Sequence, residues 1–136
     1  MTAPQVGQRQ TRQRDSILRV LESAGGPLSV PQIHERSQKK GLKVGIATVY
    51  RTVNLLQDAG LILPVALPGG ETRYEPASRG HHHHFQCRKC GRVDDLSGCL
   101  LSSAVERMLP RGYKLEGHEI TLSGLCPACN RKKRAG

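Results

Sequence analysis

The alternation of apolar and polar positions predicts three short helices in the N-terminal half of the chain. The first begins at Thr11, after a polar segment expected to be disordered, and ends at Gly25-Gly26-Pro27. Ser29 is expected to cap the second helix, which ends near Gly41. The third runs from about Thr48 to Ala59. Ile33 is expected to face inward in the second helix. The apolar positions at helical spacing in the other two are Ile17, Leu18, Leu21, Val49, Val53, Leu55 and Leu56.

Two short strands are predicted directly after the third helix. Leu61–Ala66 and Glu71–Tyr74 have a strand-like pattern, and Pro68-Gly69-Gly70 between them is typical of a turn. A hairpin that follows three helices in this order is typical of a winged helix-turn-helix, in which the third helix reads DNA. The alternative is another α+β domain that ends in a hairpin.

The composition changes after a predicted linker at residues 77–80. The expected elements of the second part are a strand in 81–90, a returning strand in 92–96, a short helix in 100–109 and a long strand in 113–125. The sequence therefore predicts an α+β protein of two domains. Residues 1–76 form a winged-helix domain, and residues 81–136 form a small α/β unit with a basic tail that is expected to be mobile.

The charge of the chain narrows the choice of partner. The formal net charge of +10 favours a polyanion, either nucleic acid or an anionic membrane surface, over a protein that is simply basic. No apolar run approaches the roughly 20 residues of a transmembrane helix, and the polar N-terminus lacks an apolar signal core. We therefore expect a cytoplasmic protein. With one Phe, three Tyr and no Trp, stacking of bases on aromatic side chains is not expected.

Four of the five cysteines form two pairs with metal-ligand spacing. Cys87 and Cys90 enclose two residues, and so do Cys126 and Cys129. Two such turns can bring four thiolates onto one tetrahedral zinc ion. In a chain with no export signal this pattern favours a metal over disulfides, and neither pair begins a βαβ unit typical of a redox pair. We expect a structural zinc without catalysis, because four thiolates leave no open position for a substrate.

Four consecutive histidines, His81–His84, indicate a second metal site. Because successive side chains of a strand point to opposite faces, the run divides into His81 with His83 and His82 with His84. Each pair can supply two ligands to a different ion. Mixed imidazole and carboxylate ligands suit Zn(II), Fe(II), Mn(II) or Ni(II). The candidates for the remaining ligands are Glu75, Asp94, Asp95, Cys99, Glu106, His118 and Glu119.

Two motifs in this order resemble those of the ferric uptake regulator family of metal-sensing repressors. The segment Gly45–Arg51 is similar to the family's recognition-helix signature, and His81–Gly91 is similar to its metal-binding signature. With the second C-x-x-C, the resemblance extends over about residues 11–130. It implies a homodimer whose second domain is the dimerisation domain. It also implies that a bound metal sets the angle between the domains, so that two winged helices fit a palindromic operator.

The resemblance also implies roles for individual residues. The regulatory metal site takes Glu75, His82, His84 and Asp95. A further site takes His81, His83 and His118. The residues assigned to DNA contacts are Thr48, Tyr50 and Arg51 in the recognition helix, together with Arg12 and Arg73.

Two positions depart from the family's pattern, and the sensed metal stays open. Pro27 stands where many iron- and peroxide-sensing members have a ligand histidine, and Ser102 stands where a glutamate completes the His81 site. Glu75 lies near the position where many zinc sensors place a cysteine. Cys99 is an alternative source of sulfur, and it is equally well interpreted as a small buried apolar residue.

We therefore predict a repressor of metal-uptake genes that binds DNA and holds a structural Zn(II) and a regulatory Fe(II), Zn(II) or Mn(II). Within the family, a zinc, manganese or peroxide-stress regulator is the alternative to an iron regulator. A small zinc metalloenzyme is disfavoured, because the chain is short and contains no H-E-x-x-H motif. A zinc-ribbon module without a sensing role is a third class. It should bind one zinc per chain, whereas a sensor should bind at least two metals.

Overall fold

The computed structural model describes residues 6–98 and 102–135, and the chain divides into two compact units after Gly80. The elements of the first unit are α1 (Val6–Glu22), α2 (Val30–Lys39), α3 (Ile46–Asp58), β1 (Ile62–Ala66), β2 (Thr72–Pro76) and the 3-10 helix η1 (Ala77–Arg79). Those of the second are β3 (His83–Cys87), β4 (Val93–Leu96), α4 (Ser102–Met108), β5 (Thr121–Gly124) and α5 (Pro127–Ala135). No helix in the described ranges is long and apolar enough to cross a membrane.

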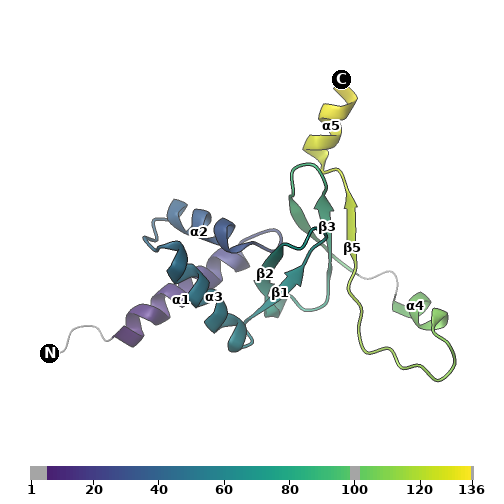
Figure 1. The fold of residues 1–136 in the computed structure, drawn as a ribbon, viewed down its shortest axis with the longest axis horizontal. Coiled ribbons are helices and arrows are strands. Elements are labelled where there is room, and N and C mark those ends of the chain that lie inside the picture. Colours follow the sequence, from purple (N-terminus) through teal and green to yellow (C-terminus); the bar gives the residue numbers. More distant parts are fainter. Residues whose placement is uncertain (1–5, 99–101, 136) are drawn as a thin grey trace. The chain divides into compact units, whose positions relative to one another are not determined.

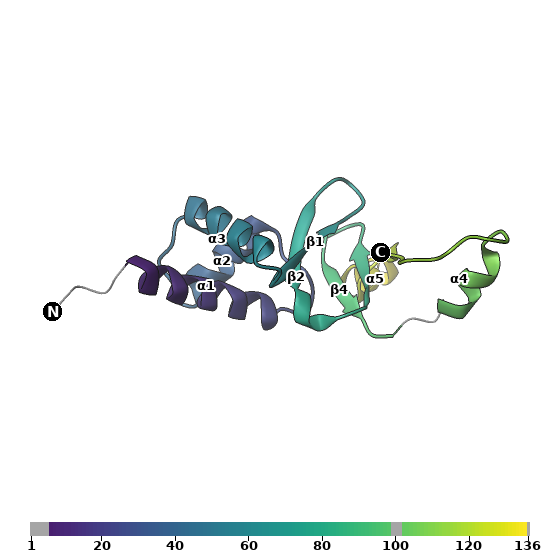
Figure 2. The same cartoon turned by 90° about the horizontal axis from the view of Figure 1, so that it is seen from below.

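The three helices of the first unit pack against one another around one apolar core (Figures 1 and 2). Ile17 and Ile33 are fully buried in it, which confirms the predicted inward faces of α1 and α2. On α3, Val49 and Leu56 are buried, whereas Leu55, another apolar position of this helix, is half exposed. Adjacent helix positions point about 100° apart, and Leu56 already occupies the inward stripe.

The start of α2 was predicted correctly from the sequence, and the start of α1 was not. The predicted cap at Ser29 is confirmed, and the structure adds a capping box: the Gln32 backbone N–H donates to Ser29 Oγ at 3.4 Å, and the Ser29 N–H donates to Gln32 Oε1 at 2.9 Å. The predicted disorder of residues 1–10 is wrong for residues 6–10, because α1 begins at Val6. The Gln and Arg side chains before Thr11 are polar but are good helix formers.

The wing is an antiparallel hairpin, as the sequence predicted. β1 and β2 pair from Ile62 opposite Pro76 to Ala66 opposite Thr72. An isolated antiparallel bridge also joins Leu28 to Tyr74 of β2. Each strand starts one residue later than expected, and β2 extends to Pro76. The segment predicted as a linker forms η1 instead. Its Arg79 guanidinium donates to the Leu21 carbonyl oxygen at 2.9 Å and also to that of Ala24, so it caps the end of α1.

The second unit is built on a three-stranded sheet in the order β4-β3-β5. β3 pairs antiparallel with β4 and parallel with β5. The predicted long strand over residues 113–125 is wrong, because only Thr121–Gly124 pairs. Strand β3 begins at His83, so the residues before Thr121 have no neighbouring strand in this sheet. The expectation of a mobile tail is also corrected, since residues 127–135 form α5.

The second unit has little apolar core. Its buried cluster among the described residues consists of Cys87, Cys126 and Cys129, with Leu125 packed against them. Val93 is also buried, whereas Met108, Tyr113 and Leu122 lie at the surface. A unit of this size with so few buried apolar groups needs a metal or an oligomeric partner to be stable.

Candidate metal centres and nucleic-acid interface

The sheet topology brings the two cysteine pairs together. Cys87 is the last residue of β3, and it lies opposite Gly124 at the end of the parallel strand β5. Cys126 follows β5 directly, and Cys129 lies in the first turn of α5. Because the carboxyl ends of neighbouring parallel strands meet at one edge, both C-x-x-C turns leave the sheet at the same place. The 35 intervening residues are spanned by β4, α4 and the return to β5.

The geometry of the four cysteines fits a tetrahedral ion. Their sulfurs all lie within 4.8 Å of one another, and the distance from Cys90 Sγ to Cys126 Sγ is 3.7 Å. Two sulfurs bound to zinc at about 2.3 Å in a tetrahedron lie about 3.8 Å apart. Backbone N–H groups of Cys90 and Cys126 lower the pKa of Cys87 to about 5, which favours its thiolate. The hydrogen bond that the Cys129 thiol donates to the Cys126 sulfur, together with burial, raises the pKa of Cys129 to about 12.

One face of the histidine run forms a second group with His118. The ring centroids of His81 and His83 are 4.7 Å apart, and the His81–His118 and His83–His118 distances are 4.7 and 5.1 Å. His83 is buried, and neither of its ring nitrogens has a hydrogen-bond partner among the described residues. Burial and the neighbouring imidazoles lower the pKa of His83, so its neutral, ligating form is favoured. The donor set fits a divalent cation.

The other face of the run joins a carboxylate. His82 and His84 have ring centroids 4.8 Å apart. Asp95 lies opposite His84 in the β3–β4 pair, and its Oδ1 is 3.6 Å from His82 Nε2 and 3.5 Å from His84 Nε2. The predicted division of the run between two faces therefore occurs in the structure. Two imidazoles and one carboxylate leave coordination positions open for at least one more ligand.

The remaining candidate ligands are placed differently. Glu75 is buried in β2, opposite Leu63, and belongs to the first unit. Asp94 lies opposite Phe85, on the other face of the sheet from His84, and it accepts a 2.8 Å hydrogen bond from Arg92, whose pKa it raises. Glu106 and Glu119 are exposed. Cys99 lies outside the residues that the structure describes.

The predicted reading helix presents polar side chains near its start. Tyr50 and Arg51 on α3 are exposed, and Thr48 is half-buried. The Arg51 guanidinium donates to Thr48 Oγ1 at 3.2 Å, which orders it on the helix surface. Arg12 is exposed on α1. The first turns of such a helix are where side chains of helix-turn-helix proteins reach base edges and phosphates.

Arg73 is the predicted DNA contact that the structure argues against. Its side chain is buried in β2, and its Nε and one terminal nitrogen donate to Glu71 Oε2 at 3.3 and 3.2 Å. A guanidinium that is buried and paired with a carboxylate is not available to a phosphate. We therefore remove Arg73 from the interface. Its charge and its place in the wing suggested a DNA contact, and only the three-dimensional structure shows the pairing with Glu71.

Comparison with known protein families gives a match over most of the chain. The model of the Ferric uptake regulator family matches residues 5–123. The chain belongs to the ferric uptake regulator family. It is therefore a metal-responsive transcription regulator, as the sequence predicted.

Similar members of the family are named for the uptake of different metals. The chain is 34% identical over 129 residues to the ferric uptake regulation protein of Bacillus subtilis (strain 168), covering 90% of this chain and 86% of the relative. It is 32% identical over 124 residues to the zinc uptake regulation protein of Mycobacterium tuberculosis (strain H37Rv), covering 90% and 95%. Among solved structures, the Helicobacter pylori ferric uptake regulator, described as having three functional metal binding sites, matches with a TM-score of 0.70 and 26% identity over 88% of this chain and 80% of that one.

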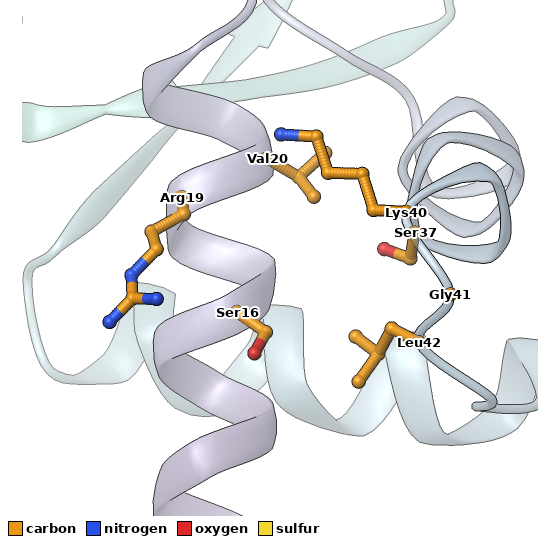
Figure 3. Close-up of a pocket in the computed structure, with 7 residues that line it drawn as sticks. All are labelled: Ser16, Arg19, Val20, Ser37, Lys40, Gly41 and Leu42. Atoms are coloured by element: carbon orange, nitrogen blue, oxygen red, sulfur yellow. The ribbon is translucent and has the colours of Figure 1, made fainter.

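A separate pocket of this regulator lies between α1 and α2 in the first unit and has a volume of about 280 Å³ (Figure 3). Lys40 reaches across it toward α1, where its Nζ donates to Ser23 Oγ at 3.2 Å. Arg19 directs its guanidinium away from the other lining side chains. The seven lining residues include no carboxylate, imidazole or thiol, so this pocket is not a metal site.

Proposed function

We propose that this member of the ferric uptake regulator family is a repressor that binds operator DNA as a homodimer when a regulatory ion is bound. The ligands that we assign to that ion are Glu75, His82, His84 and Asp95. The observation that carries the proposal is the division of the histidine run between two faces of β3, which leaves His82 and His84 facing Asp95. The four cysteines form a separate structural site with which this set shares no ligand.

Glu75 is the proposed ligand that couples metal binding to the arrangement of the two units. It lies in β2 of the winged-helix unit, whereas the other three ligands belong to the second unit. An ion that takes ligands from both units binds best to the arrangement that brings those ligands together, and so it raises the population of that arrangement. To convert a population of one in a hundred into ninety-nine in a hundred, the ion must bind that arrangement about 10⁴-fold more tightly.

The second unit supports the proposed dimer. Strand β5 is at the edge of the sheet β4-β3-β5, so one row of its backbone groups has no partner strand in that sheet. Leu122 on this strand is half exposed, and Met108 and Tyr113 are more exposed still. An unpaired edge with apolar side chains beside it is typical of a surface that pairs with a second chain. A dimer also places two reading helices on the two halves of a palindrome.

The sensed metal is iron, zinc or manganese. Two imidazoles and two carboxylates form a set of intermediate softness that all three ions accept. Relatives named for iron and for zinc are both similar to this chain. Pro27 is buried and has no ligand atom, so the first unit contributes no histidine at that position. We assign no catalytic step, and we place the regulator in the cytoplasm, where operator DNA is found.

The proposal is tested by operator binding at graded Fe(II), Mn(II) and Zn(II), with the zinc in the cysteine site left in place. The proteins compared are the wild type and the variants His82→Ala, Glu75→Ala, His81→Ala and His83→Ala. His82→Ala and Glu75→Ala should abolish the metal response while the protein stays a folded dimer with its cysteine zinc. His81→Ala and His83→Ala serve as matched controls from the opposite face of β3, and they should retain most of the response.

The reverse outcome would contradict the assignment. If the His81 and His83 variants lose metal-responsive binding while the His82 and Glu75 variants keep it, the regulatory ion lies on the other face of β3. If only one metal binds per chain, the chain has a structural zinc and no sensor. The metal that produces half-maximal operator binding at the lowest free concentration identifies the ion to which this chain responds most sensitively.

A further inference from the structure

The end of the second unit that holds the four cysteines is unusually basic. Arg88 and Lys89 are the two central residues of the first C-x-x-C turn, and both are exposed. Arg131 lies two residues after Cys129 on α5 and is also exposed. We call Arg88, Lys89 and Arg131 the knuckle surface. No salt bridge joins any of these three to another described residue, in contrast to Arg92, which pairs with Asp94 at 2.8 Å.

Acidic residues are missing from this part of the sequence. Residues 85–92 and 121–136 contain no Asp or Glu, and α5 continues with Lys132, Lys133 and Arg134. Half of the net charge of +10 belongs to residues 80–136, although the proposed reading helix lies in the first unit. Charge on the winged helix alone therefore does not explain the basic character of the chain.

The local structure holds these cations close to one another. The Arg88 backbone N–H donates to the Gly124 carbonyl oxygen at 2.8 Å, which ties the first turn to the end of β5. Arg88 and Lys89 line a pocket of about 510 Å³ together with Leu125 and Cys129, the residues that lead into α5. All three members of the knuckle surface lie within two residues of a cysteine of the four-thiol cluster. Their backbone is therefore positioned before any partner binds, which lowers the entropy lost on binding.

We propose that the knuckle surface is a second DNA-contacting surface, which binds backbone phosphates without reading the sequence. This inference rests on the proposed function, since a repressor meets DNA as its polyanion. Arginine and lysine are the side chains that bind phosphate, and the two segments that carry the knuckle surface contain no carboxylate to compete for them. With few aromatic side chains in the chain, the contact is electrostatic and does not involve base stacking.

Two structural roles for the same residues must be distinguished from DNA binding. A zinc ion with four thiolates carries a net charge of about −2, so nearby cations can stabilise the metal site. Basic residues toward the C-terminal end of a helix also stabilise its dipole. Either role predicts a loss of zinc or of thermal stability. Neither predicts a change in the number of counterions that DNA releases on binding.

The test uses the full-length, zinc-loaded protein with the regulatory metal present. The triple variant Arg88→Gln, Lys89→Gln, Arg131→Gln is compared with the wild type and with a control triple variant, Arg107→Gln, Arg111→Gln, Lys114→Gln. The control removes the same charge from exposed positions elsewhere in the second unit. The affinity for an operator duplex and for a scrambled duplex of equal length is measured against salt concentration, with zinc content and melting temperature measured for each protein.

The expected result is a shallower salt dependence for the knuckle variant only. Each lost phosphate contact lowers the slope of log K against log salt by about 0.9, so on both duplexes the slope should fall by roughly 2 to 3 for each chain, or about 5 for the homodimer. Equal slopes for all three proteins, or an equal loss in the control variant, would overturn the proposal. So would a loss confined to the operator, or one accompanied by lost zinc. If the wild type shows no metal-dependent preference for the operator, the proposed function fails, and the slopes on the scrambled duplex still decide this inference.

Discussion

Replacing one zinc ligand should unfold the second unit and leave the first intact. In Cys126→Ser, the residue between β5 and α5 loses its thiolate, and only Cys87, Cys90 and Cys129 of the cluster remain. The two units differ in what else stabilises them. The first has a core of twelve buried apolar residues, whereas the buried cluster described in the second is made of the cysteines themselves and Leu125.

The magnitude follows from that difference. Each fully buried large apolar side chain contributes about 1.5–3 kcal/mol, so the core of the first unit does not depend on a metal. A structural zinc site contributes about 10–16 kcal/mol, which is comparable with or larger than the roughly 5–15 kcal/mol of a whole domain. The described residues of the second unit form no apolar core of similar size to compensate, so losing the zinc should shift its equilibrium to the unfolded state.

Peptide-resolved hydrogen exchange with a parallel zinc determination tests this directly. Amides of β3, β4 and β5 should lose protection in Cys126→Ser, including the Cys87 N–H that donates to the Arg92 carbonyl oxygen at 2.8 Å. Amides in α1, α2 and α3 should keep theirs. Cys99→Ser is the matched control, because it makes the same chemical change at the cysteine outside the two pairs. Full zinc content and unchanged protection in Cys126→Ser, or an equal loss in Cys99→Ser, would refute the reasoning.

Three further predictions concern the reader, a helix cap and a histidine. Arg51→Ala should weaken operator binding by about 1–3 kcal/mol if the side chain contacts a base. If it contacts only phosphate, the slope of log K against log salt should fall by about one for each chain. Unchanged binding would mean that α3 is not the helix that reads DNA. Ser29→Ala removes the capping hydrogen bond of α2 and should cost about 1 kcal/mol, seen as a fall of about 4–8 °C in the melting temperature of the first unit. The pKa of His83 in the folded protein lies below its ordinary value of 6.5. In the absence of metal at this site, the unfolded chain therefore takes up a proton at a higher pH than the folded protein does. Stability should therefore decrease as pH falls below about 6.5, and His83→Gln should reduce that slope in denaturant titrations.

The sequence by itself determined the order of elements and the chemistry of the ligands. The winged helix follows from local signals: the capping box at Ser29, the buried stripes of α1 and α2, and glycines at the turn between β1 and β2. Spacing was equally informative for the metals. Two C-x-x-C pairs predict one tetrahedral site, and the alternation of a strand divides four histidines into two pairs. These signals depend on neighbours within a few residues, which is why a single sequence contains them.

Tertiary structure decided what depends on residues far apart in the chain. The length of β5 was mispredicted because a strand needs a partner, and β3 offers one only from His84 onward. The capping of α1 by Arg79, a contact between residues 58 positions apart, was not visible in any local pattern, and neither was the burial of Arg73. The parallel pairing of β3 with β5 is the most consequential of these contacts. It places the ends of two distant strands side by side, and so brings Cys87 and Cys126 together from positions that are 39 residues apart in the sequence.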